Sequence, residues 1–100
     1  MAPWALSPVA FGELLAILEY IEGESGLAAA DSVLDDFEKA FDLLASSPRA
    51  GRIRTEAAGD NIRWWLVHRY VVLYDSTTEP LRIIRILHGA RDLDSLLRPQ

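Results

Sequence analysis

A histidine near the end of the chain stands between two arginines. His88 is three positions from Arg85 and three from Arg91. Imidazole can give or take a proton near neutral pH, and guanidinium groups stabilise the charge that builds up on a phosphorane. The trio therefore has the residue types needed for cleavage of a phosphodiester by a neighbouring 2'-hydroxyl. The alternative interpretation is a histidine that closes a strand end or hydrogen-bonds a nearby loop.

Arginine is concentrated in the second half of the chain. Residues 1–48 hold one lysine and nine acidic residues, whereas residues 49–100 hold nine arginines and six acidic residues. Any polyanion would therefore have to approach the second half, because phosphate contacts dominate nucleic-acid affinity. Arginine suits protein interfaces equally well, through bidentate pairing and stacking, so an arginine-rich surface does not by itself indicate nucleic acid.

The arginines are not all expected on one surface. Arg52 and Arg54 share one face of a strand with a period of two, whereas Arg82 and Arg85 should point to opposite faces. Some of these arginines could instead form ion pairs with acidic residues of either half.

No metal or cofactor site is expected. The chain has no cysteine, and its two histidines are twenty positions apart without a third ligand at metal spacing. No glycine-rich phosphate loop, Ser-His-Asp order or pair of catalytic carboxylates is found. His68, beside Arg69 at an expected turn, is interpreted as an ordinary surface residue.

Composition predicts one soluble domain over residues 1–100. Half of the residues are hydrophobic and a quarter are charged, which excludes a disordered chain. The first residues lack the basic and apolar regions of a signal peptide, and no run of 18 apolar residues occurs. We therefore expect a cytoplasmic protein that is neither exported nor membrane-spanning. The absence of cysteine fits a reducing compartment.

Two helices are predicted in the first half. Ser7-Pro8 forms a helix start, so the first helix should run over residues 8–22 and stop at Gly23. The second should span residues 27–45, where apolar residues recur at helical spacing. Because the connection is short, the two helices should form an antiparallel hairpin.

The first helix is apolar on more than one side. Beyond its core face, further residues widen the apolar region past the usual stripe: Val9, Phe11, Leu15, Ala16 and Tyr20. Such a helix needs a second covering surface. Without a partner, the chain is expected to be aggregation-prone or poorly stable.

Strands and a last helix account for most of the remaining chain. Short apolar or alternating runs predict strands at residues 4–6, 52–56, 62–67, 70–74 and 81–87. The fold class is therefore α+β, with an N-terminal helical hairpin packed on a small antiparallel sheet. A short C-terminal helix should follow, capped by Asp92 and docked through its leucines, Leu93, Leu96 and Leu97.

Two adjacent tryptophans lie in one of these strands. Trp64 and Trp65 should point to opposite sides, one into the core and the other toward solvent or a partner. An exposed tryptophan beside arginines is a plausible binding anchor, although packing of both is an open alternative.

Three separated motifs form a family pattern. They are Ala10-x3-Leu14-x2-Ile17 with Tyr20-Ile21, then Pro48-Arg49-x-Gly51-Arg52-x-Arg54-x-Glu56, and finally RILHGARDLDSLL at residues 85–97. Together they resemble the ParE branch of the RelE/ParE toxin superfamily over roughly residues 4–97. The resemblance implies a RelE/ParE-like fold and the toxin of a type II toxin-antitoxin system, neutralised by a ParD-like antitoxin. It also implies inhibition of DNA gyrase, and so of DNA replication.

The RelE side of the superfamily suggests an alternative function. Its members look like messenger-RNA endoribonucleases that act on the ribosome, with a Tyr or His near the chain end as acid or base. This chain has Leu-Asp-Ser-Leu-Leu at residues 93–97 and no tyrosine after Tyr74. We therefore do not expect an enzyme, although a ribonuclease using His88 with Arg85 and Arg91 stays open. A third hypothesis is a toxin scaffold that has lost its activity and still binds an antitoxin.

The sequence gives two sets of candidate binding residues and no catalytic ones. The target-binding candidates are Arg52, Arg54, Arg63, Arg85, His88 and Arg91. The antitoxin-binding candidates are Phe11, Leu15, Tyr20 and Trp65. Expected partners are the antitoxin and DNA gyrase, with no membrane and no direct sequence-specific binding of nucleic acid.

Overall fold

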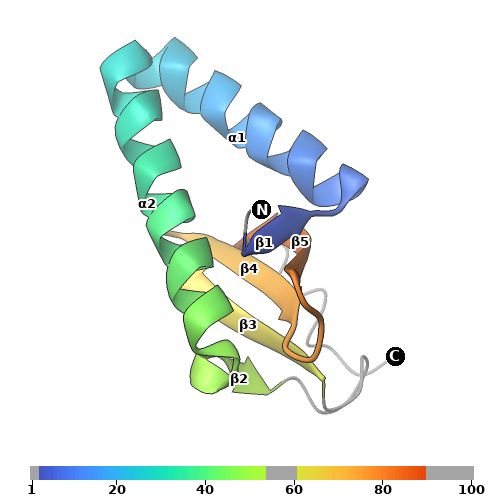
Figure 1. Cartoon of the computed structure of the whole chain (residues 1–100). Helices are drawn as coiled ribbons and strands as arrows, with labels where there is room; N and C mark the ends of the chain where they lie inside the picture. The colour runs from blue at the N-terminus through green and yellow to red at the C-terminus, as the bar shows by residue number, and fades with distance from the viewer. Residues whose placement is uncertain (1–2, 54–60, 90–100) are drawn as a thin grey trace.

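Two antiparallel helices cover one face of a five-stranded sheet in the computed structural model, and the tip of the helical hairpin projects beyond the sheet (Figure 1). The structure describes residues 3–53 and 61–89. The elements in chain order are β1 (Trp4–Leu6), α1 (Pro8–Ser25), α2 (Leu27–Ser46), the short 3-10 helix η1 (Pro48–Ala50), β2 (Arg52–Ile53), β3 (Ile62–Val67), β4 (Tyr70–Asp75) and β5 (Leu81–His88). The predicted α+β fold with an N-terminal helical hairpin is confirmed.

The start of α1 is capped, and its end lies later than the sequence predicted. The Ser7 side chain accepts a hydrogen bond from the Ala10 amide at 3.0 Å, and Pro8 takes the first helical position. The helix continues past Gly23, because glycine inside a helix costs only about 1 kcal/mol. It ends at Gly26, whose φ of 91° lies in the region that favours glycine.

The sheet is mixed rather than wholly antiparallel. Its strand order is β1-β5-β4-β3-β2, in which β1 pairs parallel to β5 and the other pairs are antiparallel. Trp4 lies opposite Leu81 and Leu6 opposite Ile83. The turn signals that set the antiparallel hairpins do not specify a partner for an isolated first strand. The expectation of an antiparallel sheet is therefore wrong for this one pair.

The main hydrophobic core lies between the helices and the sheet. Its largest fully buried members include Phe37 and Phe41 from α2 and Ile83 from β5, and Trp65 packs against it. A smaller cluster on the opposite sheet face consists of Val71, Leu73 and Leu87, with Trp64 packed against it. The two tryptophans thus face opposite sides as predicted, but both are half-buried and neither projects freely into solvent.

A bulge in β5 decides which arginines share a face. The register shifts between Leu73 and Tyr74 of β4, which leaves one extra residue in β5 between Arg82 and Arg85. Arg82 lies opposite Asp75 and Arg85 opposite Leu73, and both of these β4 positions face away from the helices. The prediction that Arg82 and Arg85 point to opposite faces is therefore wrong, because counting by two assumes an unbroken strand.

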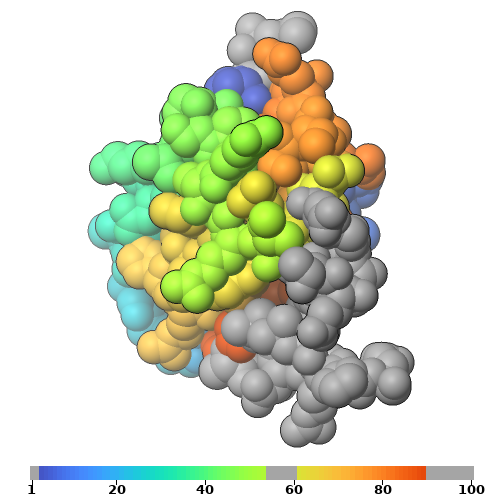
Figure 2. All heavy atoms as spheres, turned by 90° about the horizontal axis from the view of Figure 1, so that it is seen from below, coloured from blue at the N-terminus to red at the C-terminus, as the bar shows by residue number. Residues whose placement is uncertain are grey.

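A buried tyrosine ties the segment after α2 to the sheet. The Tyr74 hydroxyl donates a hydrogen bond to the Pro48 carbonyl at 2.7 Å and accepts one from the Gly51 amide at 2.8 Å. Seen from below, η1 and β2 (green) lie against β3 (yellow) (Figure 2). Burial raises the pKa of Tyr74 above its ordinary value of 10.0, while the Gly51 hydrogen bond and the Arg63 charge act in the opposite direction.

Candidate interaction surfaces

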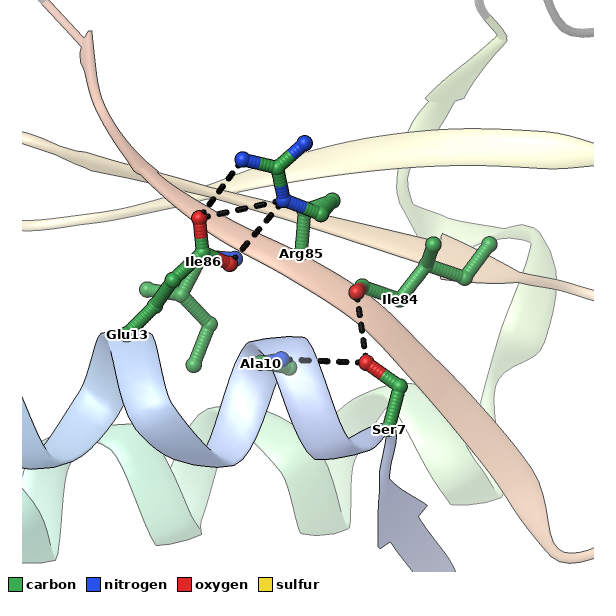
Figure 3. A network of polar contacts seen from close by, with 6 residues as sticks. All are labelled: Ser7, Ala10, Glu13, Ile84, Arg85 and Ile86. Carbon is green, nitrogen blue, oxygen red and sulfur yellow. Dashed lines mark hydrogen bonds and ion pairs between the residues drawn. The ribbon is translucent and has the colours of Figure 1, made fainter.

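A carboxylate on α1 covers the part of the β5 edge that β1 leaves unpaired. Strand β1 pairs with β5 only as far as Ile83. Beyond that point, the Glu13 side chain accepts a hydrogen bond from the Ile86 amide at 2.8 Å and holds the Arg85 guanidinium at 2.8 to 3.1 Å (Figure 3). The Ser7 hydroxyl completes this edge by donating to the Ile84 carbonyl at 2.7 Å.

The ion pair ties Arg85 of β5 to helix α1. The Arg85 side chain is 42% exposed and that of Glu13 is 21% exposed, so the pair is partly shielded from water. Two parallel N–H···O contacts between a guanidinium and a carboxylate give a geometrically specific interaction. Arg85 was predicted to bind a target, and any target must compete with Glu13 for it.

An open groove lies beneath the hairpin, where the helices extend past the sheet. Its volume is about 900 Å³. The walls and floor carry apolar side chains, among them Ile17, Tyr20, Val33 and Ile86. Charged and titratable groups lie at its margins: Glu13, Glu24, His68, Arg69 and His88. A volume of this size accommodates several bulky side chains of a partner.

The predicted antitoxin-binding residues do not form one surface. Tyr20 lines the groove and is 65% exposed. Phe11 and Leu15 are 53% and 45% exposed, but they are not among the groove residues. Trp65 packs against the main core under the helices. The assignment of all four residues to an antitoxin stays a prediction, and the geometry divides it over separate regions.

The predicted target-binding arginines are also divided. Arg52 stacks over the Trp64 ring at 5.5 Å, on the sheet face that points away from the helices. Arg63 lies on the opposite face, where it donates to the backbone carbonyls of Arg49 and Gly51 at 3.2 and 2.8 Å. Arg63 thus secures the backbone around η1, a role that the sequence pattern did not indicate.

His88 lies on the helix-facing side of the sheet. It pairs with Tyr70 across the strands, and the two rings meet edge to face at 5.6 Å. Arg85 belongs to the other face, opposite Leu73. The strand register thus directs the two described members of the predicted His-Arg trio to opposite sides of β5, and the Arg85 guanidinium reaches Glu13 at the strand edge.

His68 has a defined partner rather than an ordinary surface position. It occupies the β3–β4 turn with a φ of 55°, and its Nε2 lies 2.7 Å from a carboxylate oxygen of Asp36 on α2. Both side chains are about half exposed, so we expect the contact to add little stability. The contact fixes one end of the groove to the second helix.

Several predictions fall outside the described residues. Arg54 and Arg91 belong to this group, and so does the C-terminal helix with Asp92. Within residues 3–53 and 61–89, no three potential metal ligands come together as a metal site would require. In the same part of the chain, no helix combines the length and apolarity needed to cross a membrane.

Sequence reasoning missed Glu13 and Tyr74. Glu13 is the only charged residue among residues 8–18, a run that is otherwise apolar, and this isolation was a usable signal. A charge in such a run needs a partner when the helix packs. Tyr74 sits among apolar strand residues, and nothing in its spacing indicated a hydrogen-bonding role.

The profile of a family described as "ParE toxin of type II toxin-antitoxin system, parDE" matches residues 5–93. The chain belongs to the ParE toxin family. No curated protein matches it.

A solved structure supports the ParE-type fold. It is described as "Chromosomal ParDE TA system from P. aeruginosa", and the match has a TM-score of 0.69 at 16% sequence identity. The alignment covers 85% of this chain and 92% of the P. aeruginosa chain. At this identity, the comparison establishes a shared fold for the ParE-family chain.

Proposed function

We propose that this ParE-family toxin acts by binding DNA gyrase and inhibiting DNA replication, and that a ParD-like antitoxin in the cytoplasm neutralises it. Family membership supports the toxin role, and gyrase is the target that the ParE resemblance implies. One observation favours binding over catalysis: the Glu13 carboxylate already holds the Arg85 guanidinium at 2.8 to 3.1 Å. In acid-base cleavage of a phosphodiester, an arginine would have to bind the phosphate instead.

The apolar exposed sides of α1 support an antitoxin partner. Val9, Phe11, Leu15 and Tyr20 are all between 45% and 65% exposed on this one helix. Exposed apolar area of this kind marks an interaction surface in a soluble protein. An antitoxin helix laid against one side of α1 would remove part of this area from water.

Two assays on the purified chain test the proposal. In a gyrase supercoiling reaction, we expect loss of supercoiled product, and recovery when the antitoxin is added. In a translating ribosome reaction followed by primer extension, we expect no new cuts in the message. Cuts that disappear in a His88→Ala variant would instead establish a ribonuclease.

An experiment in cells identifies the pathway independently. After induced expression, DNA synthesis and protein synthesis are labelled separately. We expect DNA labelling to fall first. A primary fall in protein labelling would contradict the gyrase assignment. If both assays and both labels stay unchanged while the antitoxin binds, the chain is an inactive scaffold.

A further inference from the structure

Helix α1 has two exposed flanks with different chemistry. Ala16, Tyr20 and Glu24 follow one another at i, i+4 and i+8 and line the groove. On the other side of the helix lie residues that do not line it: Phe11, Gly12, Leu15, Glu19 and Glu22. We call this second set the acidic flank. A partner helix seated in the groove would leave the acidic flank uncovered.

The acidic flank changes from apolar to charged along the helix. Phe11 and Leu15 are 53% and 45% exposed, and a Cβ at Gly12 would meet no atom within 4 Å. A second helix could therefore approach the backbone closely here. About one and two turns beyond Leu15, Glu19 and Glu22 are exposed to solvent. Leu15 and Glu22 are separated by roughly 10 Å along the axis, at 1.5 Å per residue.

The end of α1 lacks the positive charge that a helix C-terminus favours. Its last turn contains no basic residue, while Glu22 and Glu24 lie near the negative end of the helix dipole. Each such carboxylate is unfavourable there, and a cation nearby would offset the effect. A partner that brings lysine or arginine to this position gains from both the side chains and the dipole.

The neighbouring helix strengthens the negative field. The exposed acids of α2 are Asp31, Asp35, Glu38 and Asp42, and Lys39 is the only base on either helix. Nucleic acid and anionic lipid surfaces would be repelled by such a field. Charge complementarity thus selects a cationic protein segment with an apolar side.

We propose that the acidic flank of α1 docks a basic amphipathic helix of a partner protein. Aliphatic side chains of that helix pack over Phe11, Gly12 and Leu15, and its lysines or arginines reach Glu19 and Glu22, one to two turns further along α1. The inference rests on the proposed function in one respect, which is that the antitoxin is the chain carrying this helix.

Two designed peptides probe the flank directly. Both are helices of about 18 residues with the same leucine face, and they differ only in carrying lysine or glutamate on the polar side. At low salt, we expect the lysine peptide to bind the full-length protein at least about tenfold more tightly, with the advantage shrinking as salt screens the charges. Equal binding of the two peptides would overturn the proposal.

Matched variants separate the flank from the charge of the whole protein. Glu22→Lys should weaken binding of the lysine peptide by roughly three- to fivefold, whereas Glu79→Lys, an equal charge change on the exposed β4–β5 loop, should leave it unchanged. Leu15→Ala should weaken binding more than Leu43→Ala, because both leucines are 45% exposed but only Leu15 belongs to the flank. Equal effects within either pair would show general attraction and refute the site.

Two further measurements decide the occupant. Sedimentation with vesicles that contain anionic lipid should leave the protein in the supernatant, and co-sedimentation would identify a membrane surface instead. Excess antitoxin should displace the lysine peptide. If the toxin-antitoxin complex still binds the peptide, the antitoxin does not occupy this flank. None of these measurements uses gyrase, so a negative gyrase assay leaves the docking proposal intact.

Discussion

The Glu13 carboxylate takes the place of a strand beside Arg85. One of its oxygens accepts the Ile86 amide at 2.8 Å, as a backbone carbonyl would, and both oxygens receive hydrogen bonds from the Arg85 guanidinium. A single side chain thus protects a sheet edge that would otherwise expose an unpaired donor. The same contacts fix the position of α1 along β5.

Removing this carboxylate should destabilise the fold. Glu13→Ala leaves the Ile86 amide without its acceptor and Arg85 without its partner, and we expect a loss of about 1.5 to 3 kcal/mol in the free energy of unfolding. Glu13→Gln keeps an acceptor for Ile86 and should cost less. Urea denaturation measures both, with the exposed Glu19→Ala as a control expected within about 0.5 kcal/mol of the parent. Equal effects of Glu13→Ala and Glu19→Ala would contradict the edge role.

The helix cap at Ser7 gives a second prediction. Its side chain accepts from the Ala10 amide and donates to the Ile84 carbonyl, so Ser7→Ala removes a cap and a tie to the sheet together. We expect a loss of about 1 to 2 kcal/mol, measured by chemical denaturation. Ser46→Ala, which removes an exposed contact with the Leu43 carbonyl in the last turn of α2, should change stability far less. Similar losses in the two variants would count against the dual role of Ser7.

Burial of Tyr74 should make the folded protein less stable at alkaline pH. Its folded-state pKa is raised by burial, so the folded protein keeps the phenolic proton above pH 10 while the unfolded chain loses it. The stability present below the ordinary pKa of 10.0 should therefore fall as pH rises through the folded-state pKa. Tyr74→Phe removes this slope and also unpairs the Gly51 amide, so it should be less stable by roughly 1 to 3 kcal/mol at neutral pH. Thermal unfolding at pH values from 7 to about 11 tests both effects. A parent and variant with parallel pH profiles would disprove the assignment.

Alanine substitutions at two glycines should change the stability of the protein in opposite directions. A Cβ at Gly51 would lie 2.8 Å from the Trp64 carbonyl oxygen and against the Tyr74 side chain, so Gly51→Ala forces backbone atoms apart and should cost roughly 1 to 3 kcal/mol. Gly23 is in open space inside α1, and Gly23→Ala should add about 0.5 to 1 kcal/mol. Melting temperatures by circular dichroism report the two signs. A neutral Gly51→Ala would mean that the segment from η1 to β2 can move away from β4.

Periodicity predicted the helices and strands well because each is encoded locally. The capping pair Ser7-Pro8, the apolar stripe of α2 and the alternating runs of β3 and β4 all report short-range geometry. The structure differs from the predictions where contacts between residues far apart in the sequence determine the strand partner or the ion pair. The parallel partner of β1 and the Glu13–Arg85 pair join positions more than 70 residues apart. No local pattern contains such information.

The candidate site was harder to predict than the fold. Arg63 and Arg85 were selected by residue type, but both make defined contacts within the protein. The bulge in β5 also moved Arg85 to the face that carries Arg82, and no spacing rule anticipates an extra residue. The exposed apolar residues Phe11, Leu15 and Tyr20 were identified correctly as surplus, because a helix can bury only one stripe.

The pairing of β1 with β5 sets the order in which the protein can be completed. Trp4 and Leu81 are neighbours in the sheet, so the strand made first during synthesis waits for the strand made near the end. Pairing of such distant segments slows folding, because the entropy of loop closure opposes it. Synthesis of β5 must therefore precede completion of the sheet, because β5 is the strand that joins β1 to the antiparallel strands.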